Sequence, residues 1–430
     1  MKTLRKVIVS VIAIVFLIAT CWSIHSKVSP QNRDINSLYD ATNSKVELTI
    51  ATISENADLN IVVAEFNNNN KDCHITVLDY SDNGALSLEK AMEKLSTTII
   101  SGNFPDMICF SSLSPYPFIS KHLLLDLNKF IDQDNQICLS DIAVSKAIDF
   151  NGNIYFVGNK FNYETIVGKY SEFGDRYGWT LSEYLGIEKT LPKDVEMIYN
   201  ITKSSFLRSV SARYIESAID WENGTCDFNN DEFIAILEAS SRIRETPENQ
   251  KDLDYSYPSA DVASGKLVTS MLFGDSVFKL AFDEKMAGCQ LSYIGWPTVD
   301  GSCGSDIYLH SPIGITIRSK HPDECWSFLK YMMMNVDEED IFSLPVYLPA
   351  LQKMVKAAIN NKELPVQMDE KDAEQLYSLI SNIENVAFYD ETVLKIITQE
   401  GQSYLNGSRT AEETASIIQS KVSIYVSEQG

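Results

Sequence analysis

The first part of the chain alternates between strand-like and helix-like patterns of hydrophobic residues. Val46, Leu48 and Ile50 occupy every second position and predict a strand. The alternation continues as helix, strand, helix and strand over four further segments: 59–66, 75–77, 88–99 and 106–110. This β-α-β-α-β order is typical of a mostly parallel sheet that is covered by helices. We therefore expect an α/β fold.

Three polar segments follow the carboxyl ends of the predicted strands. In open sheets of this kind, ligands bind beyond those ends. The three segments are 53–56, 80–83 and 110–114. Asp106 lies at the opposite end, because it begins the third strand and precedes Phe110 by ~13 Å at ~3.3 Å per residue. We expect Asp106 to be a structural carboxylate that caps a loop amide.

The remainder of the chain reads as short strands and helices. Residues 154–157 and 313–317 have the pattern of strands. Acidic residues at 231–232 and the proline at 322 are typical of helix starts. From residue 351 onward the pattern is mostly helical.

The N-terminus has the pattern of a secretory signal over residues 1–20. Three basic residues precede a run over 7–19 that is apolar except for one serine and is shorter than a membrane span. The sequence Leu-Ile-Ala-Thr-Cys at its end resembles a bacterial lipobox, in which Cys21 becomes the lipid-modified first residue. Thr20 departs from that pattern, so a simple signal peptide or an uncleaved anchor stays open. Each alternative places the folded part outside the cytoplasm.

The charge of the chain excludes two classes of partner. The formal net charge is −23, and removal of the three basic residues within 1–20 takes it to −26. Such a surface is repelled by nucleic-acid phosphates and by anionic lipids, so we expect neither as a partner. Residues 21–44 are polar and predict a flexible tether between membrane and folded body.

Cysteine and histidine usage gives no support for a metal site or a cofactor. Apart from Cys21, seven scattered cysteines form no CxxC pair, which is a poor disulfide framework and a poor zinc site. Cys109 and Cys325 lie within apolar patterns and are expected in the core. The chain has five histidines and no HExxH motif, so a metal hydrolase is not expected.

Several pieces, taken in order, resemble the family 1 extracellular solute-binding proteins of ABC importers. These are the opening strand and helix, Ser-Gly-Asn-Phe-Pro-Asp before a strand (101–106), the stretch 122–131, Ile-Gly-Trp-Pro before a glycine-rich loop (294–297), and a strand-Ser-Lys-helix that ends Trp-x-Phe-Leu-Lys (326–330). Each motif alone is unspecific, whereas their order behind a lipobox-like signal is characteristic. The resemblance covers residues 46–333.

The resemblance implies two α/β lobes, each a mostly parallel sheet flanked by helices, with a ligand cleft between them. It implies a first lobe of 45–157 plus 306–343 and a second lobe of 160–300 plus 345–430. The chain would cross between the lobes near 158–161, 298–305 and 342–349. Glycine and proline in these ranges suit hinges, which need unusual backbone angles. The protein is expected to be a monomer.

The resemblance also implies a function without covalent chemistry. The protein would capture a carbohydrate, in our interpretation an oligosaccharide, and deliver it to an ABC permease in the membrane. Three alternatives stay open: a non-sugar solute such as a peptide, polyamine or phosphate ester; a receptor linked to a sensor kinase; and a secreted glycoside hydrolase. The hydrolase needs two carboxylates at a set separation. The neighbouring acids 283–284 do not face each other on a helix, and no other hydrolase motif appears.

Sugar binding needs aromatic faces against the ring and planar polar groups for the hydroxyls. The candidates that follow predicted strands or lie near predicted crossings are Glu55, Asn56, Phe110, Ser111, Ser112, Asn159, Tyr163, Phe273, Asp275 and Trp296. Each also has a structural interpretation, as a helix cap, a turn residue, hinge packing or a core aromatic. Tyr80 and Trp221 are weaker candidates for ligand contact, because such aromatics more often belong to the surface or the core. The sequence identifies neither the sugar nor its linkage.

Overall fold

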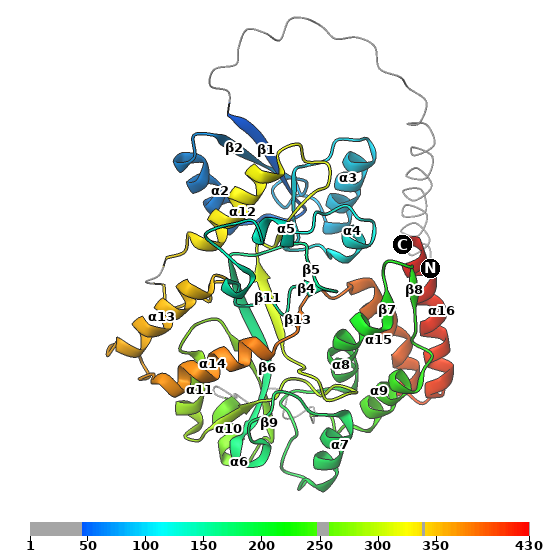
Figure 1. The fold of residues 1–430 in the computed structure, drawn as a ribbon. Coiled ribbons are helices and arrows are strands. Elements are labelled where there is room, and N and C mark those ends of the chain that lie inside the picture. The colour runs from blue at the N-terminus through cyan, green and yellow to red at the C-terminus, as the bar shows by residue number, and fades with distance from the viewer. Residues whose placement is uncertain (1–44, 247–257, 338–339, 430) are drawn as a thin grey trace, which may run out of the picture.

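The computed structural model describes residues 45–246, 258–337 and 340–429 (Figure 1). The predicted signal peptide, the tether and lipidation at Cys21 lie outside the described residues. Two sheets occupy different ends of the molecule, and helices surround both (Figure 1).

The first sheet has the strand order β12-β3-β1-β2. Its strands are β1 (Val46–Thr52), β2 (Cys73–Asp79), β3 (Met107–Cys109) and β12 (Ile313–Ile315). β1 pairs in parallel with both β2 and β3, and only β12 runs antiparallel to its neighbour. The helices α2 (Ala57–Asn69), α3 (Leu88–Ile100) and α12 (Pro322–Met334) flank it, with four short elements nearby: α4 (Tyr116–Ser120), α5 (Asn128–Ile131), η2 (Leu139–Asp141) and the hairpin β4–β5 (Asp149–Phe150 and Asn153–Ile154). The predicted mostly parallel sheet is confirmed here.

The second sheet is centred on one long strand, β6 (Lys160–Lys169). Its other strands are β9 (Thr269–Gly274), β10 (Leu291–Tyr293), β11 (Asp306–His310) and β13 (Asn385–Val386). β6 pairs antiparallel with β9, β10 and β11, and only β11 and β13 are parallel. The prediction of a mostly parallel sheet in each lobe is therefore wrong for this sheet. The chain enters along β6 and returns along the adjacent β11, so these strands must run in opposite directions.

The remaining helices lie around the second sheet (Figure 1). They are α6 (Tyr170–Phe173), α7 (Leu181–Thr190), α8 (Lys203–Ala218), α9 (Asp231–Arg242), α10 (Pro258–Ser264), α11 (Lys279–Ala287), α13 (Leu348–Asn360), α14 (Glu370–Asn382), α15 (Glu391–Leu405) and α16 (Ala411–Gln429), with the hairpin β7–β8 (Ile219–Asp220 and Thr225–Cys226) after α8. Successive side chains of β6 point to opposite faces. Tyr163 and Val167 accordingly belong to one core cluster, and Ile166 belongs to the other, which includes α8 and α15.

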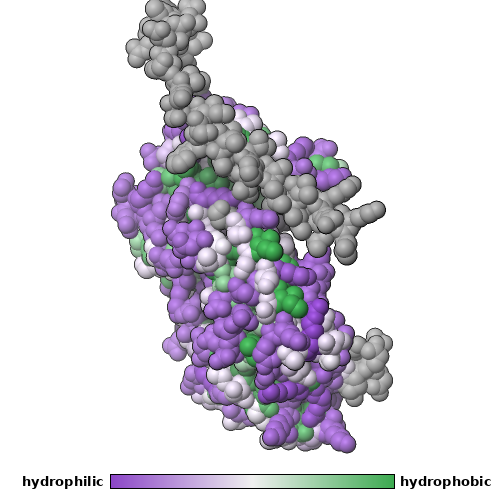
Figure 2. All heavy atoms as spheres, turned by 90° about the vertical axis from the view of Figure 1, so that its right-hand side faces the viewer, coloured by the Kyte–Doolittle hydropathy of each residue, from purple (hydrophilic) through white to green (hydrophobic). Residues whose placement is uncertain are grey.

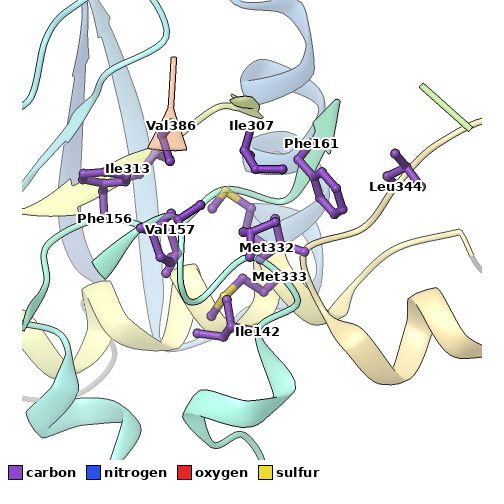
Figure 3. Close-up of a cluster of buried hydrophobic side chains, with 14 of the residues drawn as sticks. Ile142, Phe156, Val157, Phe161, Ile307, Ile313, Met332, Met333, Leu344 and Val386 are labelled. Atoms are coloured by element: carbon purple, nitrogen blue, oxygen red, sulfur yellow. The ribbon is translucent and has the colours of Figure 1, made fainter. Parts of the chain in front are cut away.

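Three chain segments lie side by side where the sheets meet. Phe161 pairs with Leu309 of β11, and its backbone N–H donates to the Leu344 carbonyl over 2.8 Å. Buried side chains from both halves of the chain form a continuous core around these segments, among them Val157, Ile307 of β11 and Met332 of α12 (Figure 3).

Two of these three segments fall within ranges where the sequence predicts crossings, 158–161 and 342–349. The third runs along β11 and returns to the first sheet at β12, after the predicted range 298–305. The lobe boundaries themselves stay a prediction.

Asp106 has the structural role that was expected of it. Its Oδ2 accepts hydrogen bonds from the Thr49 N–H over 3.0 Å and the Thr49 hydroxyl over 2.9 Å. Its Oδ1 accepts from the Ser319 hydroxyl over 2.8 Å. The amide belongs to strand β1 rather than to a loop. Cys109 and Cys325 are buried, as predicted.

The surface of the described part is mainly polar. On the face in Figure 2, hydrophilic side chains predominate, and the hydrophobic ones form small separate spots between them. Across the described ranges, the search for a helix of sufficient length and hydrophobicity to cross a bilayer found none.

Candidate functional site

A solvent-open hollow of about 340 Å³ lies beyond the carboxyl ends of β1 and β3. This is the position where ligands are expected on such a sheet. Eight of its ten lining residues are polar; the lining consists of Ser54, Glu55, Asn56, Ala57, Asp58, Ser111, Ser112, Leu309, His310 and Ser311. We call this feature the hollow.

Asn56 organises the hollow. Its Oδ1 accepts a hydrogen bond from the Leu59 N–H and so caps α2, while its Nδ2 donates to Ser111 over 2.9 Å and to Ser311 over 3.1 Å. One amide thus joins the ends of β1 and β3 to the segment after β11. Ser54 and Ser112 add a hydroxyl contact of 3.0 Å across the same edge. The result is a largely preformed polar surface.

His310 connects the hollow to the second sheet. Its Nδ1 lies 3.9 Å from a carboxylate oxygen of Asp58. Burial lowers the pKa of His310, and the charge of Asp58 opposes that shift only in part. The imidazole is therefore mainly neutral at pH 7.

The face of the second sheet that carries His310 is also polar along β6 and β11. Residue pairs that lie opposite each other in a sheet point to the same side. The register of β6 and β11 pairs His310 with Lys160, Tyr308 with Asn162, and Asp306 with Glu164. We call these six residues the floor. His310 belongs to both the floor and the hollow, so the two surfaces are continuous.

Arg213 of α8 holds Asp306 and Glu164, the pair of acids at one end of the floor. Its guanidinium forms a close ion pair with Asp306 and a second one with Glu164 over 3.2 Å. It also donates to the carbonyls of Gly304 over 2.8 Å and Ser209 over 2.7 Å. The side chain is 4% exposed. A buried charge needs such partners, because removal of one of them is strongly destabilising.

Asp306 is the most deeply buried acid of this network. Burial raises its pKa to about 6, although the positive charge of Arg213 opposes the shift. The hydroxyl of Tyr389 lies beside the carboxylate and also opposes the shift, because it hydrogen-bonds to the charged form. Burial therefore destabilises the ionised form of Asp306, so the contribution of this residue to stability depends on pH.

Aromatic side chains flank the carboxylate of Glu164. Trp296 donates its Nε1–H to Oε1 over 3.1 Å, and the Tyr308 hydroxyl donates to Oε2 over 3.2 Å. The ring of Phe273 meets the ring of Tyr308 edge to face, with centroids 5.8 Å apart. Phe273 is 45% exposed, whereas Trp296 is buried.

A second aromatic pair closes the side of this region. Tyr116, at the start of α4, stacks on Trp221 of the β7–β8 turn. Behind them lies a cavity of about 10 Å³, which has room for about one water molecule. Its lining includes Arg213, Glu216 and Tyr389.

The structure brings together some of the sequence-predicted residues and separates others. Glu55, Asn56, Ser111 and Ser112 meet in the hollow, and Phe273 and Trp296 meet at Glu164.

The remaining candidates lie elsewhere. Phe110 is fully buried and contacts Phe118 and Phe156, and Tyr163 is fully buried over Gly274. Asn159 is 6% exposed at a crossing, and Asp275 is exposed after β9.

Sequence reasoning missed Glu164, Arg213, Tyr308 and Tyr116, and it gave Trp221 little weight. A partial signal existed in β6, where Lys160, Asn162 and Glu164 alternate with buried residues. Within the described ranges, no group of three or more His, Cys, Asp or Glu is placed to hold a metal ion.

Neither a protein-family model nor a curated protein matches this chain. Many solved structures share its fold. An extracellular solute-binding protein family 1 from Alicyclobacillus acidocaldarius aligns with TM-score 0.54 and 15% identity, over 90% of this chain and 100% of that one. The sugar-binding protein MalE from Xanthomonas citri aligns with TM-score 0.56 and 14% identity, over 89% and 97%.

Two further structures align equally well. The cyclic alpha-maltosyl-1,6-maltose binding protein from Arthrobacter globiformis gives TM-score 0.52 at 14% identity, over 89% of this chain and 100% of that one. The de novo designed cysteine esterase ECH19 gives TM-score 0.56 at 13% identity, over 90% and 99%. The predicted fold class, two α/β lobes as in periplasmic binding proteins, is confirmed. At these identities the likeness establishes the fold alone.

Proposed function

We propose that this protein is a family 1 solute-binding component of an ABC importer that captures a carbohydrate outside the cytoplasm and delivers it to a permease. It performs no covalent chemistry. One observation supports the proposal: the polar hollow shares His310 with the polar pairs of β6 and β11, and these pairs reach Glu164, which lies opposite the exposed Phe273. In this proposal Cys21 carries the lipid that holds the protein at the outer face of the membrane.

The chemistry of the surface suits a polyhydroxylated ligand. The hollow presents hydroxyl, amide and carboxylate groups from Asn56, Ser111 and Glu55. Such groups bind sugar hydroxyls and reject analogues that lack them, because the protein groups would then be left unpaired. An oligosaccharide, as the resemblance implies, would extend from His310 along β11 to Tyr308 and the exposed ring of Phe273.

Delivery requires that the ligand prefer one arrangement of the lobes. A ligand that binds both arrangements equally could not shift them. The lobes in this proposal rotate about the three adjacent segments near Phe161, Leu309 and Leu344. Groups from both sides of those segments line the binding surface, so closure brings additional contacts to the ligand.

The alternatives have weaker physical support. A polyamine needs several free carboxylates that converge; Glu164 and Asp306 share Arg213, which leaves Glu55 and Asp58 of the hollow for such a ligand. The hydrolase needs two carboxylates that face one substrate. Asp283 pairs with Lys279 and Glu284 accepts from the Leu291 N–H, so both have structural partners. A sensor-linked receptor would use the same cleft; permease genes beside this gene would support import, and a histidine kinase gene would support sensing.

A thermal-shift screen across oligosaccharides, peptides and polyamines tests the proposal. A ligand at a hundred times its Kd stabilises the folded state by about 2.7 kcal/mol. We expect a shift with a carbohydrate and none with the other classes. If a peptide or polyamine shifts the transition and no carbohydrate does, the sugar assignment fails. Turnover of a chromogenic glycoside would instead establish the hydrolase.

A further inference from the structure

Glu164 is a carboxylate with one acceptor position still unused. An ionised carboxylate offers about four lone-pair sites. Three are taken: Arg213 and Trp296 donate to Oε1, and Tyr308 donates to Oε2. Oε2 thus has one acceptor site without a donor, and the side chain as a whole is 19% exposed.

The three donors hold Glu164 in a single orientation. Arg213 is itself fixed by Asp306, Gly304 and Ser209, and Trp296 is 4% exposed. A side chain that is ordered before the ligand arrives pays little conformational entropy on binding. Glu164 is therefore suited to recognition as well as to stability.

An exposed aromatic surface lies beside this acceptor. Phe273 is directly opposite Glu164 in the pairing of β9 with β6, and its ring contacts the ring of Tyr308. Phe273 is 45% exposed, so its ring is accessible to a ligand. An apolar ring face beside a hydrogen-bond acceptor matches a sugar ring, whose apolar face and hydroxyl rim lie side by side.

The charges of the floor disfavour an anionic ligand. Arg213 is shared between Asp306 and Glu164, so this cluster carries more negative than positive groups. Lys160 pairs with Asp340 over 3.2 Å, and His310 lies beside Asp58. An anion would therefore meet more carboxylates than cations, and the cations Arg213 and Lys160 are already engaged; like charges in contact cost several kcal/mol.

We infer that Glu164 accepts a hydrogen bond from a hydroxyl of a neutral sugar whose ring lies against Phe273 and Tyr308, and that the cleft rejects acidic sugars. This inference rests on the proposed function and adds the residue and the ligand class. Arg213 acts as a positioning residue, because it reaches the ligand only through Glu164.

Isothermal titration of the wild type and Glu164→Gln, with maltotriose, xylotriose, cellotriose and trigalacturonic acid as probes, tests the inference. In the variant the amide oxygen can still accept from Arg213 and Trp296, while the amide NH₂ replaces the free acceptor. Arg213 keeps Asp306, so the variant should fold. We expect the neutral trisaccharide that the wild type binds to bind ~10- to 100-fold more weakly, as for a lost hydrogen bond to a charged group. Glu172→Gln, which removes the same charge at a 50% exposed site near Lys169, is the matched control and should bind as the wild type does.

The possible results distinguish a failure of the inference about Glu164 from a failure of the proposed function. Unchanged affinity in Glu164→Gln, or binding of trigalacturonic acid as tightly as the neutral probes, would overturn the inference and leave the proposed function in place. If Glu164→Gln does not fold, Phe273→Ala decides, because its ring is half-exposed; unchanged affinity there overturns the inference. A wild type that binds no carbohydrate but binds a peptide or polyamine would overturn the proposed function itself.

Discussion

The ring of Tyr116 lies parallel to the indole of Trp221, with an interplanar angle of 3° and centroids 6.2 Å apart. Tyr116 follows the first sheet in the chain, whereas Trp221 lies in the hairpin after α8 and packs in the core of the second sheet. Trp221 is 5% exposed. The stack therefore joins the two halves of the molecule, and movement of the halves apart must expose the indole.

Tyr116→Ala should expose Trp221 in the protein without ligand. An aromatic pair contributes about 0.5–1.5 kcal/mol beyond its buried area, so its loss favours separation of the rings. We expect the tryptophan emission of the variant to shift to longer wavelength. The same substitution in a Trp221→Phe background should give no shift. An equal shift in that background would show that another tryptophan responds and that the stack does not hold the two halves together.

Asp306→Asn should change the pH dependence of stability. The folded-state pKa of Asp306 is raised from 3.8 to about 6, so the native state binds more protons than the unfolded state between these values. Stability from this group is complete below about pH 4 and is lost as pH rises to 6, by up to about 3 kcal/mol. Asparagine resembles the protonated acid and does not titrate.

Urea denaturation of both proteins from pH 4 to 7 measures this effect. The free energy of unfolding of Asp306→Asn should rise relative to the wild type as pH rises through 4–6, and the difference should then level off. The lowered pKa values of other acids, such as Glu400 beside Lys421, are common to both proteins and cancel in the difference. A difference that stays constant with pH would contradict the assignment.

The first sheet could be predicted because its strands and helices alternate along the chain. The alternation of Val46, Leu48 and Ile50 predicts β1. The next helix leads to β2 and the helix after it leads to β3, and both of these strands pair with β1. The local pattern therefore agrees with the topology. The polar ends of β1 and β3, with Asn56 and Ser111, follow from the same rule. The positions of residues in the predicted sheet thus identified half of the residues that line the hollow.

The second sheet could not be predicted in this way, because its pairings join segments far apart in the chain. Glu164, Arg213 and Asp306 meet only once β6 and β11 have paired and α8 has packed on them. The Tyr116–Trp221 contact depends in addition on how the two halves sit together. The spacing of residues along the sequence therefore does not predict these contacts.

Phe110→Ala should destabilise the fold rather than the complex. The ring is fully buried against Phe118 and Phe156, and loss of such a side chain costs about 3–5 kcal/mol. Ser111→Ala is the neighbouring control: it should change stability by less than about 0.5 kcal/mol, because the side chain is exposed, yet weaken a ligand held in the hollow. Thermal denaturation and titration separate these effects. Unchanged stability with lost affinity in Phe110→Ala would instead support the ligand contact that the sequence predicts.

Gly304→Ala should both destabilise the protein and weaken ligand binding. A Cβ on Gly304 would lie 1.9 Å from the Trp296 carbonyl oxygen, because the two backbones approach at the bridge between Gly295 and Gly304. The Gly304 carbonyl also accepts from the Trp296 N–H over 3.0 Å and from Arg213 over 2.8 Å, so its displacement moves both groups that hold Glu164.

Gly186→Ala in α7 is the control for the same chemical change. A Cβ there meets open space, and alanine at an exposed helical position should stabilise by about 0.5–1 kcal/mol. Melting temperatures and oligosaccharide affinities of the two variants give opposite expectations: lower stability and weaker binding for Gly304→Ala, higher stability and unchanged binding for Gly186→Ala. Wild-type affinity in a destabilised Gly304→Ala would show that the position of Glu164 does not depend on this backbone contact.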